Sequence, residues 1–160
     1  LVENALAQPQ VPVHRDYHAR NLMILHEDSL GVLDFQDAVF GPVTYDLVSL
    51  LRDCYIVWPD EKVSAWCQHY HAMLVARGRL SCEFSQFKTW FDLMGLQRHL
   101  KAAGIFARLS LRDGKHGYLA DIPRVVDYLV RISGQHHSLK TFHAFLVKKV
   151  QPLLKDGLSA

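Results

Sequence analysis

The chain has 160 residues, of which 49% are hydrophobic, and its 18 basic and 16 acidic side chains leave a formal net charge of +2. A chain of this size can bury a sizeable core in one domain, and the balanced charge argues against nucleic acid or a membrane surface as the main partner. No apolar run approaches the roughly 18 residues that cross a bilayer, and the first ten residues show no secretion signal, so we expect a cytoplasmic protein that binds a small molecule.

In chain order, the first predicted elements are β-strands. Residues 11–14 indicate a short strand, and two apolar runs, over residues 22–26 and 31–35, predict a hairpin. The turn signals between these runs are Glu27, Asp28, Ser29 and Gly31. The hairpin places Asn21 near its start and Asp34 near its end, so closing the turn would bring these two side chains together.

The sequence beyond residue 42 favours helices. The first predicted helix begins near Thr44 and has one apolar face, formed by Leu47, Leu51, Cys54 and Trp58. A second begins at Asp60, which is expected to cap it, and ends at Gly78. The three cysteines show no CxxC spacing, so we expect buried thiols rather than a disulfide framework or a zinc site.

A longer helical region is predicted over residues 83–112, and Gly95 and Gly104 are expected to bend or break it. Asp121, followed by Pro123 in the first turn, opens another helix, and Ser138 opens the last one. These elements indicate an α+β fold that is mainly α, in which a small β-hairpin precedes a helical bundle within one domain.

Two motifs carry the predicted chemistry: HRDYHARN, which begins at His14, and DFQDA, which begins at Asp34. Asp16 can accept a proton from an attacking hydroxyl, Asn21 follows it by five residues, and Asp34 lies beyond the hairpin. Magnesium prefers hard oxygen donors and usually takes few of them from the protein. The pattern therefore predicts a phosphoryl-transfer site in which Asp16 is catalytic and Asn21 and Asp34 are magnesium ligands.

Between residues 12 and 52, HRDYHARN, VLDFQDA and GPVTYDLVSLL resemble the catalytic loop, metal loop and following helix of the aminoglycoside phosphotransferase-like kinases, small-molecule relatives of protein kinases. RDCYIVWP, MGLQRHLKAAGIFARL and RDGKHGYLADIPR resemble one branch of that family, the bacterial anomeric kinases of N-acetylmuramate and N-acetylglucosamine used in cell-wall recycling. The resemblance implies a protein-kinase-like C-terminal lobe that works with ATP and Mg²⁺ and phosphorylates a hydroxyl of an amino sugar.

Residue by residue, the resemblance implies that Asp16 orients or deprotonates the acceptor hydroxyl, while Asn21 and Asp34 hold magnesium on the nucleotide phosphates. His14 would brace the catalytic loop by packing and hydrogen bonding. Asp46 would tie the following helix to that loop, although a carboxylate in the first turn of a helix is favourable in any case.

Three further positions keep two interpretations each. Asp37 matches an acidic position common in the family, where it would support the metal loop, but a solvated turn residue is an equal alternative. His18 and Arg20 lie inside the catalytic loop, where each faces phosphate, substrate or a carboxylate, or has a structural role only.

A kinase of this type also needs a lobe with a phosphate-covering loop and a lysine that pairs with the phosphates. The first lysine of this sequence is Lys62 and the first glycine is Gly31. We therefore expect residues 1–160 to be the C-terminal, catalytic and substrate-binding lobe of a longer kinase, without the N-terminal nucleotide-binding lobe. Alone, this lobe is expected to be inactive and to self-associate through the exposed lobe interface.

The acceptor is expected to bind in the helical part, where Arg98, His99 and Arg108 interrupt apolar surroundings. An arginine fork would recognise the carboxylate of a muramate-type sugar, but a solvated helix surface is the alternative for these three residues. Other functions also stay open: a kinase of an aminoglycoside, choline or homoserine, a non-catalytic kinase-like binding module, and a metal-dependent hydrolase.

Overall fold

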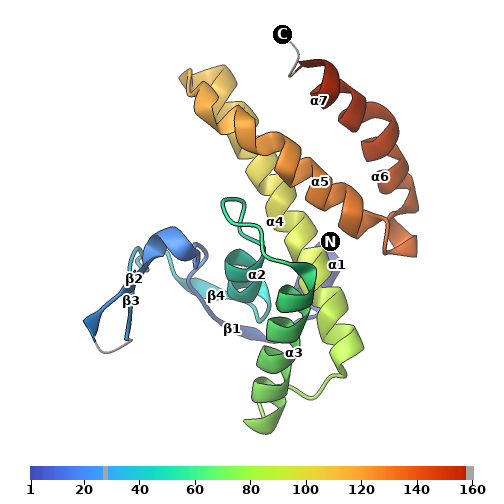
Figure 1. The fold of residues 1–160 in the computed structure, drawn as a ribbon. Helices are drawn as coiled ribbons and strands as arrows, with labels where there is room; N and C mark the ends of the chain where they lie inside the picture. Colours follow the sequence, from blue (N-terminus) through green and yellow to red (C-terminus); the bar gives the residue numbers. More distant parts are fainter. Residues whose placement is uncertain (27–28, 158–160) are drawn as a thin grey trace. The chain divides into compact units, whose positions relative to one another are not determined.

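Helices make up most of the fold, which a computed structural model describes for residues 1–26 and 29–157 (Figure 1). Strands form two small antiparallel sheets of two strands each, in agreement with the predicted α+β class that is mainly α. The chain divides into two compact units, with the boundary after Gly95. The assignment of residues 1–160 to one catalytic and substrate-binding lobe stays a prediction.

The first unit contains all the strands of the described residues. Its elements before the long helices are α1 (Val2–Leu6), β1 (Gln10–Val13), the 3₁₀ turn η1 (Ala19–Asn21), β2 (Leu22–Ile24), β3 (Leu30–Val32) and β4 (Val39–Pro42). β2 and β3 form the predicted hairpin, in which Leu22 pairs with Val32. The predicted turn residues Glu27 and Asp28 lie outside the described residues. Figure 1 shows β2 and β3 extending away from β1, β4 and α2.

β4, which the sequence did not predict, pairs with β1 and fixes the end of that strand. Val13 pairs with Val39, and Gly41 pairs with Val11. A Cβ atom at Gly41 would lie only 2.7 Å from a methyl carbon of Val13, so a side chain at this position would push the two strands apart. Glycine at position 41 therefore permits the close approach of β4 to the last residue before His14.

Three helices complete the first unit: α2 (Tyr45–Leu51), α3 (Asp60–Ala76) and the first part of α4 (Phe84–Asp113). The first helix was predicted to extend too far. α2 ends at Leu51, so Cys54 and Trp58 lie outside it and do not belong to its apolar face. The Asp53 carboxylate accepts the backbone N–H of Tyr55 at 3.0 Å, a local turn that competes with further helix. The predicted cap was also wrong, since Pro59 occupies the cap position and Asp60 lies in the first turn.

The core of the first unit lies among α2, α3 and α4. Its buried members are Val43, Val48, Leu51, Val63, Cys67, Leu80, Phe87, Trp90, Phe91 and Met94. Burial raises the pKa of the Cys67 thiol to about 12, so this cysteine is the neutral, apolar group that the sequence predicted. Cys54 and Cys82 are only half-buried.

The second unit begins within α4, which runs through Gly95 and Gly104 without the expected break. Its other elements are η3 (His116–Asp121), α5 (Ile122–Ser133), η4 (His137–Leu139), α6 (Lys140–Phe145), the π-helical turn η5 (Leu146–Val150) and α7 (Gln151–Gly157). Pro123 lies in the first turn of α5, as predicted, whereas Ser138 lies in η4 ahead of α6. The buried face of α5, which includes Val125, Leu129 and Ile132, supplies much of this unit's core.

Within the part of the chain that the structure describes, none of the helices combines the length and apolar character needed to cross a membrane.

Candidate active site

The predicted catalytic loop connects β1 to β2 and is attached to α2 by one carboxylate. Asp46 Oδ2 accepts the backbone N–H of His14 at 2.6 Å, and Asp46 Oδ1 accepts that of Arg15 at 3.1 Å. This is the link between the helix and the loop that the family resemblance implied. Hydrogen bonds to a charged group contribute about 1.5–3 kcal/mol each, so the pair strongly favours this path of the loop.

Two non-glycine residues among those described have a left-handed backbone, and both belong to the predicted motifs. Arg15 has a φ of 76° and Asp34 a φ of 63°. This conformation is uncommon for residues with a side chain and persists where surrounding contacts enforce it. At Arg15 the Asp46 carboxylate supplies one such contact, so the chain direction immediately before Asp16 is set by α2.

A set of hydrogen bonds connects the three segments that carry the predicted base and metal ligands. The side-chain amide of Asn21 donates to the backbone carbonyl of Asp16 at 2.9 Å. The backbone N–H of Leu33 donates to the carbonyl of Asn21 at 2.9 Å, and His14 Nε2 donates to the carbonyl of Leu33 at 2.8 Å. The structure thus brings Asp16, Asn21 and the residue before Asp34 together, with the His14 side chain bonded to the last of these; the bracing role of His14 stays a prediction.

Asn21 and Asp34 carry oxygen atoms of the kind that magnesium prefers. Because Asn21 uses its amide nitrogen to bond Asp16, its amide oxygen remains as a donor for a cation. One carboxylate oxygen of Asp34 accepts a hydrogen bond from the Gln36 side chain, which orients the carboxylate. The described residues include no cluster of three His, Cys, Asp or Glu side chains suited to holding a metal. A cation here would therefore depend on Asn21, Asp34 and oxygens of the substrate.

The acidic side chains of the two motifs are open to solvent. Asp16, Asp34 and Asp37 are exposed, whereas Asn21 is half-buried. Asp37 contributes its backbone carbonyl, which accepts a hydrogen bond from the Arg15 guanidinium at 3.4 Å. This contact joins the two motifs through main-chain oxygen, so the predicted supporting role of the Asp37 carboxylate stays a prediction.

His18 and Arg20 contact a residue that the sequence analysis did not select, Tyr55. The Arg20 guanidinium lies 3.6 Å from the centre of the Tyr55 ring, and the His18 ring meets it edge-on with centroids 5.9 Å apart. The structure therefore favours the structural interpretation of both side chains. The sequence signal was available in the RDCYIVWP segment, but no periodicity connects residue 55 to a loop over thirty residues earlier.

The three predicted acceptor residues do not share one face of α4. His99 and Arg108 are nine residues apart, which is about 180° around a helix with 3.6 residues per turn. His99 is buried and its ring stacks on Tyr128 with centroids 3.9 Å apart, whereas Arg98 is half-buried and Arg108 is exposed. A site that uses all three from one side of this helix is therefore excluded, and the Arg98–His99 pair is the more compact candidate.

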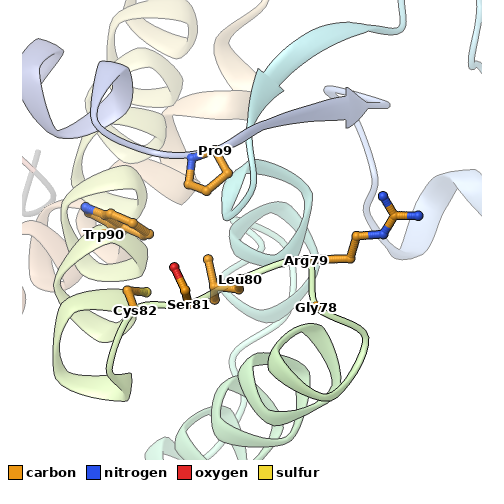
Figure 2. A pocket seen from close by; sticks show the side chains of 7 residues that line it. All are labelled: Pro9, Gly78, Arg79, Leu80, Ser81, Cys82 and Trp90. Atoms are coloured by element: carbon orange, nitrogen blue, oxygen red, sulfur yellow. The ribbon is translucent and has the colours of Figure 1, made fainter.

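A cleft of about 310 Å³ lies at the opposite end of β1 from the catalytic loop. Pro9 and Trp90 flank it, the Ser81 hydroxyl points into it, and the Arg79 side chain extends away from it (Figure 2). Its remaining lining is Gly78, Leu80 and Cys82, so no residue of HRDYHARN or DFQDA contributes to it.

Comparison with known proteins gives a family match over the first half of the chain. Residues 1–83 match the model of the phosphotransferase enzyme family. The chain belongs to this family. The matched region contains β4 and also the catalytic loop, the hairpin and α2, the three parts that the contacts of Asp46, Asn21 and His14 join.

Similar curated proteins share one name, N-acetylmuramate/N-acetylglucosamine kinase. The chain is 51% identical over 151 residues to the protein of Neisseria meningitidis, covering 94% of this chain and 45% of that relative. It is 49% identical over 140 residues to the Pseudomonas putida protein, covering 87% and 41%, and 52% identical over 130 residues to the Pseudomonas aeruginosa protein, covering 81% and 38%. These matches confirm the resemblance. The chain spans less than half the length of these relatives.

Replacing Asp46 by alanine is expected to loosen the catalytic loop, because two backbone N–H groups lose their acceptor. We expect the free energy of unfolding to fall by about 2–4 kcal/mol, and Asp46→Asn, which keeps one acceptor, to lose less. Urea denaturation measures the stability, and hydrogen exchange measures protection of the His14 and Arg15 amides. Asp127→Ala, at an exposed position on α5, is the matched control. Equal protection in wild type and Asp46→Ala would contradict the assigned role.

Proposed function

We propose that this chain is the catalytic and substrate-binding C-terminal lobe of a longer ATP-dependent kinase, and that the kinase phosphorylates the anomeric hydroxyl of N-acetylmuramate and N-acetylglucosamine. The observation that carries the proposal is the hydrogen-bond set that joins Asp16, Asn21 and Leu33, in a chain about half identical to kinases with that name. A protein-kinase-like arrangement of this lobe is part of the proposal. Its place would be the cytoplasm, where ATP is available.

In the proposed reaction the acceptor oxygen forms a bond to the terminal phosphorus of ATP while the bond from that phosphorus to the ADP oxygen breaks. The Asp16 carboxylate orients the acceptor hydroxyl and receives its proton. Asn21 and Asp34 would hold magnesium, which would supply positive charge to the phosphate oxygens. The transferring group needs positioning more than strong base catalysis, so the loop geometry set by His14 and Asp46 matters as much as the base itself.

The preference for an amino sugar over other acceptors rests on the names of the relatives and on the helical part of the chain. Arg98 and His99 are adjacent on α4, and an arginine there would bind the carboxylate of a muramate-type sugar. A kinase of an aminoglycoside, choline or homoserine is the second candidate, because the phosphotransferase enzyme family match covers the catalytic loops and ends at residue 83, before α4 begins.

A surface near the catalytic loops supports the proposed second lobe. Large apolar side chains are exposed along the hairpin and the segment that follows it: Met23, Ile24, Leu25, Leu30, Val32, Leu33, Phe35, Val39 and Phe40. Soluble proteins seldom leave such a concentration uncovered without a partner. We propose that the nucleotide-binding lobe covers this surface in the longer protein, and that a second copy covers it in the isolated chain.

The acceptor can be identified by competition. Full-length protein is offered ATP, Mg²⁺ and equal amounts of N-acetylmuramate, N-acetylglucosamine and an aminoglycoside, and mass spectrometry identifies the phosphorylated products. We expect phosphate on the two amino sugars, and a phosphatase specific for anomeric phosphates should release it. Phosphate on the aminoglycoside alone would favour the second candidate. Release of inorganic phosphate without a phosphorylated acceptor would indicate a hydrolase. Magnesium-dependent binding of ATP without turnover would indicate a non-catalytic binding module.

Asp16→Asn is expected to reduce kcat by roughly 100-fold or more in the full-length protein, the usual scale for losing a positioned acid or base. Asparagine keeps the shape of the side chain but does not accept the proton, so the KM for ATP should change little. Steady-state kinetics with the preferred acceptor measure both quantities, with Glu61→Gln, an exposed carboxylate of α3, as the control. A near-normal kcat would refute the catalytic role of Asp16.

Residues 1–160 alone are expected to show negligible turnover, because neither a phosphate-covering loop nor a phosphate-binding lysine from a nucleotide lobe restrains ATP. A coupled assay of ATP consumption with both amino sugars measures this, and full-length protein in the same buffer is the positive control. Sedimentation of the same sample tests self-association of the exposed apolar surface. Substantial turnover would contradict the proposal that ATP binding requires a second lobe. A monomer at high concentration would contradict the proposed self-association.

A further inference from the structure

The segment after α2, residues 52–58, contacts the catalytic loop between its two functional residues. His18 and Arg20 lie between Asp16 and Asn21, and both place their side chains against the ring of Tyr55. His18 packs its edge on this ring although its Nδ1 atom is buried without a hydrogen-bond partner among the described residues. An unpaired buried nitrogen has a free-energy cost, and the contact with the Tyr55 ring is one favourable interaction of this side chain that acts against it.

Two sets of contacts fix the position of Tyr55: one at its own backbone and one at the start of its segment. Its backbone N–H donates to the Asp53 carboxylate at 3.0 Å, which closes a turn directly after α2. At the start of the segment, the Arg52 guanidinium is buried, forms an ion pair with Asp92 at 2.9 Å, and lies over the Phe91 ring at 4.5 Å. The segment is thereby anchored to α4, and Tyr55 presents a fixed surface to the loop.

We propose that Tyr55 is a positioning residue of the phosphotransferase reaction. Its ring holds Arg20 by a cation–π contact and His18 by an edge contact, and so fixes the distance between the proton acceptor at position 16 and the metal-binding amide at position 21. The aromatic ring, rather than the hydroxyl group, would position the loop, since both contacts are made to the ring. The inference rests on the proposed function of the same loop and adds a residue from outside the two catalytic motifs.

The test compares Tyr55→Leu, which removes the ring, with Tyr55→Phe, which keeps it, in the full-length protein. We expect Tyr55→Leu to lower kcat by about 10-fold or more, since displacement of a catalytic group by about 1 Å can cost on the order of 100-fold, with the KM values for ATP and sugar changed by less than about threefold. Tyr55→Phe should retain nearly all of the wild-type kcat. Hydrogen exchange should show faster exchange of the peptide 14–21 in Tyr55→Leu only.

Trp66→Leu is the matched control, because Trp66 pairs edge-on with Trp58 at the far end of the same segment, with centroids 5.3 Å apart. It removes an aromatic contact of the segment without removing the ring that meets Arg20, so kcat and loop exchange should stay near wild type. An equal loss of kcat in Trp66→Leu would overturn the proposal, as would an equal loss in Tyr55→Phe or an effect of Tyr55→Leu on KM alone.

Arg20→Gln gives a second route if Tyr55→Leu does not fold. It removes the guanidinium from the other side of the contact, and we expect the same pattern of lower kcat with little change in KM. Where both variants fold, the double variant should lose little more than either single one, whereas additive losses would contradict a shared contact. The exchange measurement needs no turnover. If the wild type phosphorylates no sugar, the proposed function fails while the loop contact is still tested.

Discussion

The carboxylate of Asp46 accepts the first two backbone N–H groups of the catalytic loop, and the geometry of the candidate site depends on this contact. At Arg15 the chain turns through a left-handed conformation, and the second of the two hydrogen bonds is made by the N–H of that residue. Without the carboxylate, the turn would retain its strain and lose two strong hydrogen bonds. The direction in which Asp16 leaves the turn is therefore a property of α2 as much as of the loop.

α2 can hold this position because it is anchored at both ends. A helix of seven residues is unstable alone, so its order must come from packing. Near its start, the Gln8 side-chain oxygen accepts the Thr44 hydroxyl at 2.7 Å, and Val48 is completely buried. At its end, Arg52 pairs with Asp92, which also binds Lys88. Removing one partner of such a buried pair costs about 3–5 kcal/mol, so the ion pair fixes α2 in one orientation.

The catalytic motifs and the hairpin were predictable from sequence because their signals are local. A turn between two apolar runs encodes the hairpin, and fixed spacing relates Asp16 to Asn21. β4 was missed because its four residues contain Gly41 and Pro42, which weaken any strand pattern, and because its pairing with β1 joins residues about thirty positions apart. The end of α2 was misplaced for a different reason. Residues 47, 51, 54 and 58 keep a helical spacing, but the side chain of Asp53 forms a turn that competes with helix.

The predicted acceptor residues were the hardest to place from sequence, since their grouping depends on which helix faces meet in space. Arg98, His99 and Arg108 were selected because they interrupt apolar surroundings, although the continuity of α4 directs His99 and Arg108 to opposite sides. His99 shows why composition misleads here, because its imidazole stacks on Tyr128 within the second unit's buried side chains. Tyr55 was missed for the converse reason. An aromatic residue in an irregular segment has no pattern to mark it, and its contacts with His18 and Arg20 appear only in the folded loop.

Asp16 and Asp34 are exposed to water, which weakens their electrostatic interactions unless another group covers them. Two unit charges 4 Å apart interact by only about 1 kcal/mol in water, but by about 4 kcal/mol at the lower effective dielectric near a protein surface. Asp16 and Asp34 are solvent-exposed, so in the proposed reaction the attraction of the Asp34 carboxylate for a magnesium ion would be strongly screened by water. Exclusion of water when the substrates bind would strengthen this attraction and that of the metal for the phosphate oxygens. The apolar side chains between Met23 and Phe40 lie along the segments that carry Asn21 and Asp34, where such cover would have this effect.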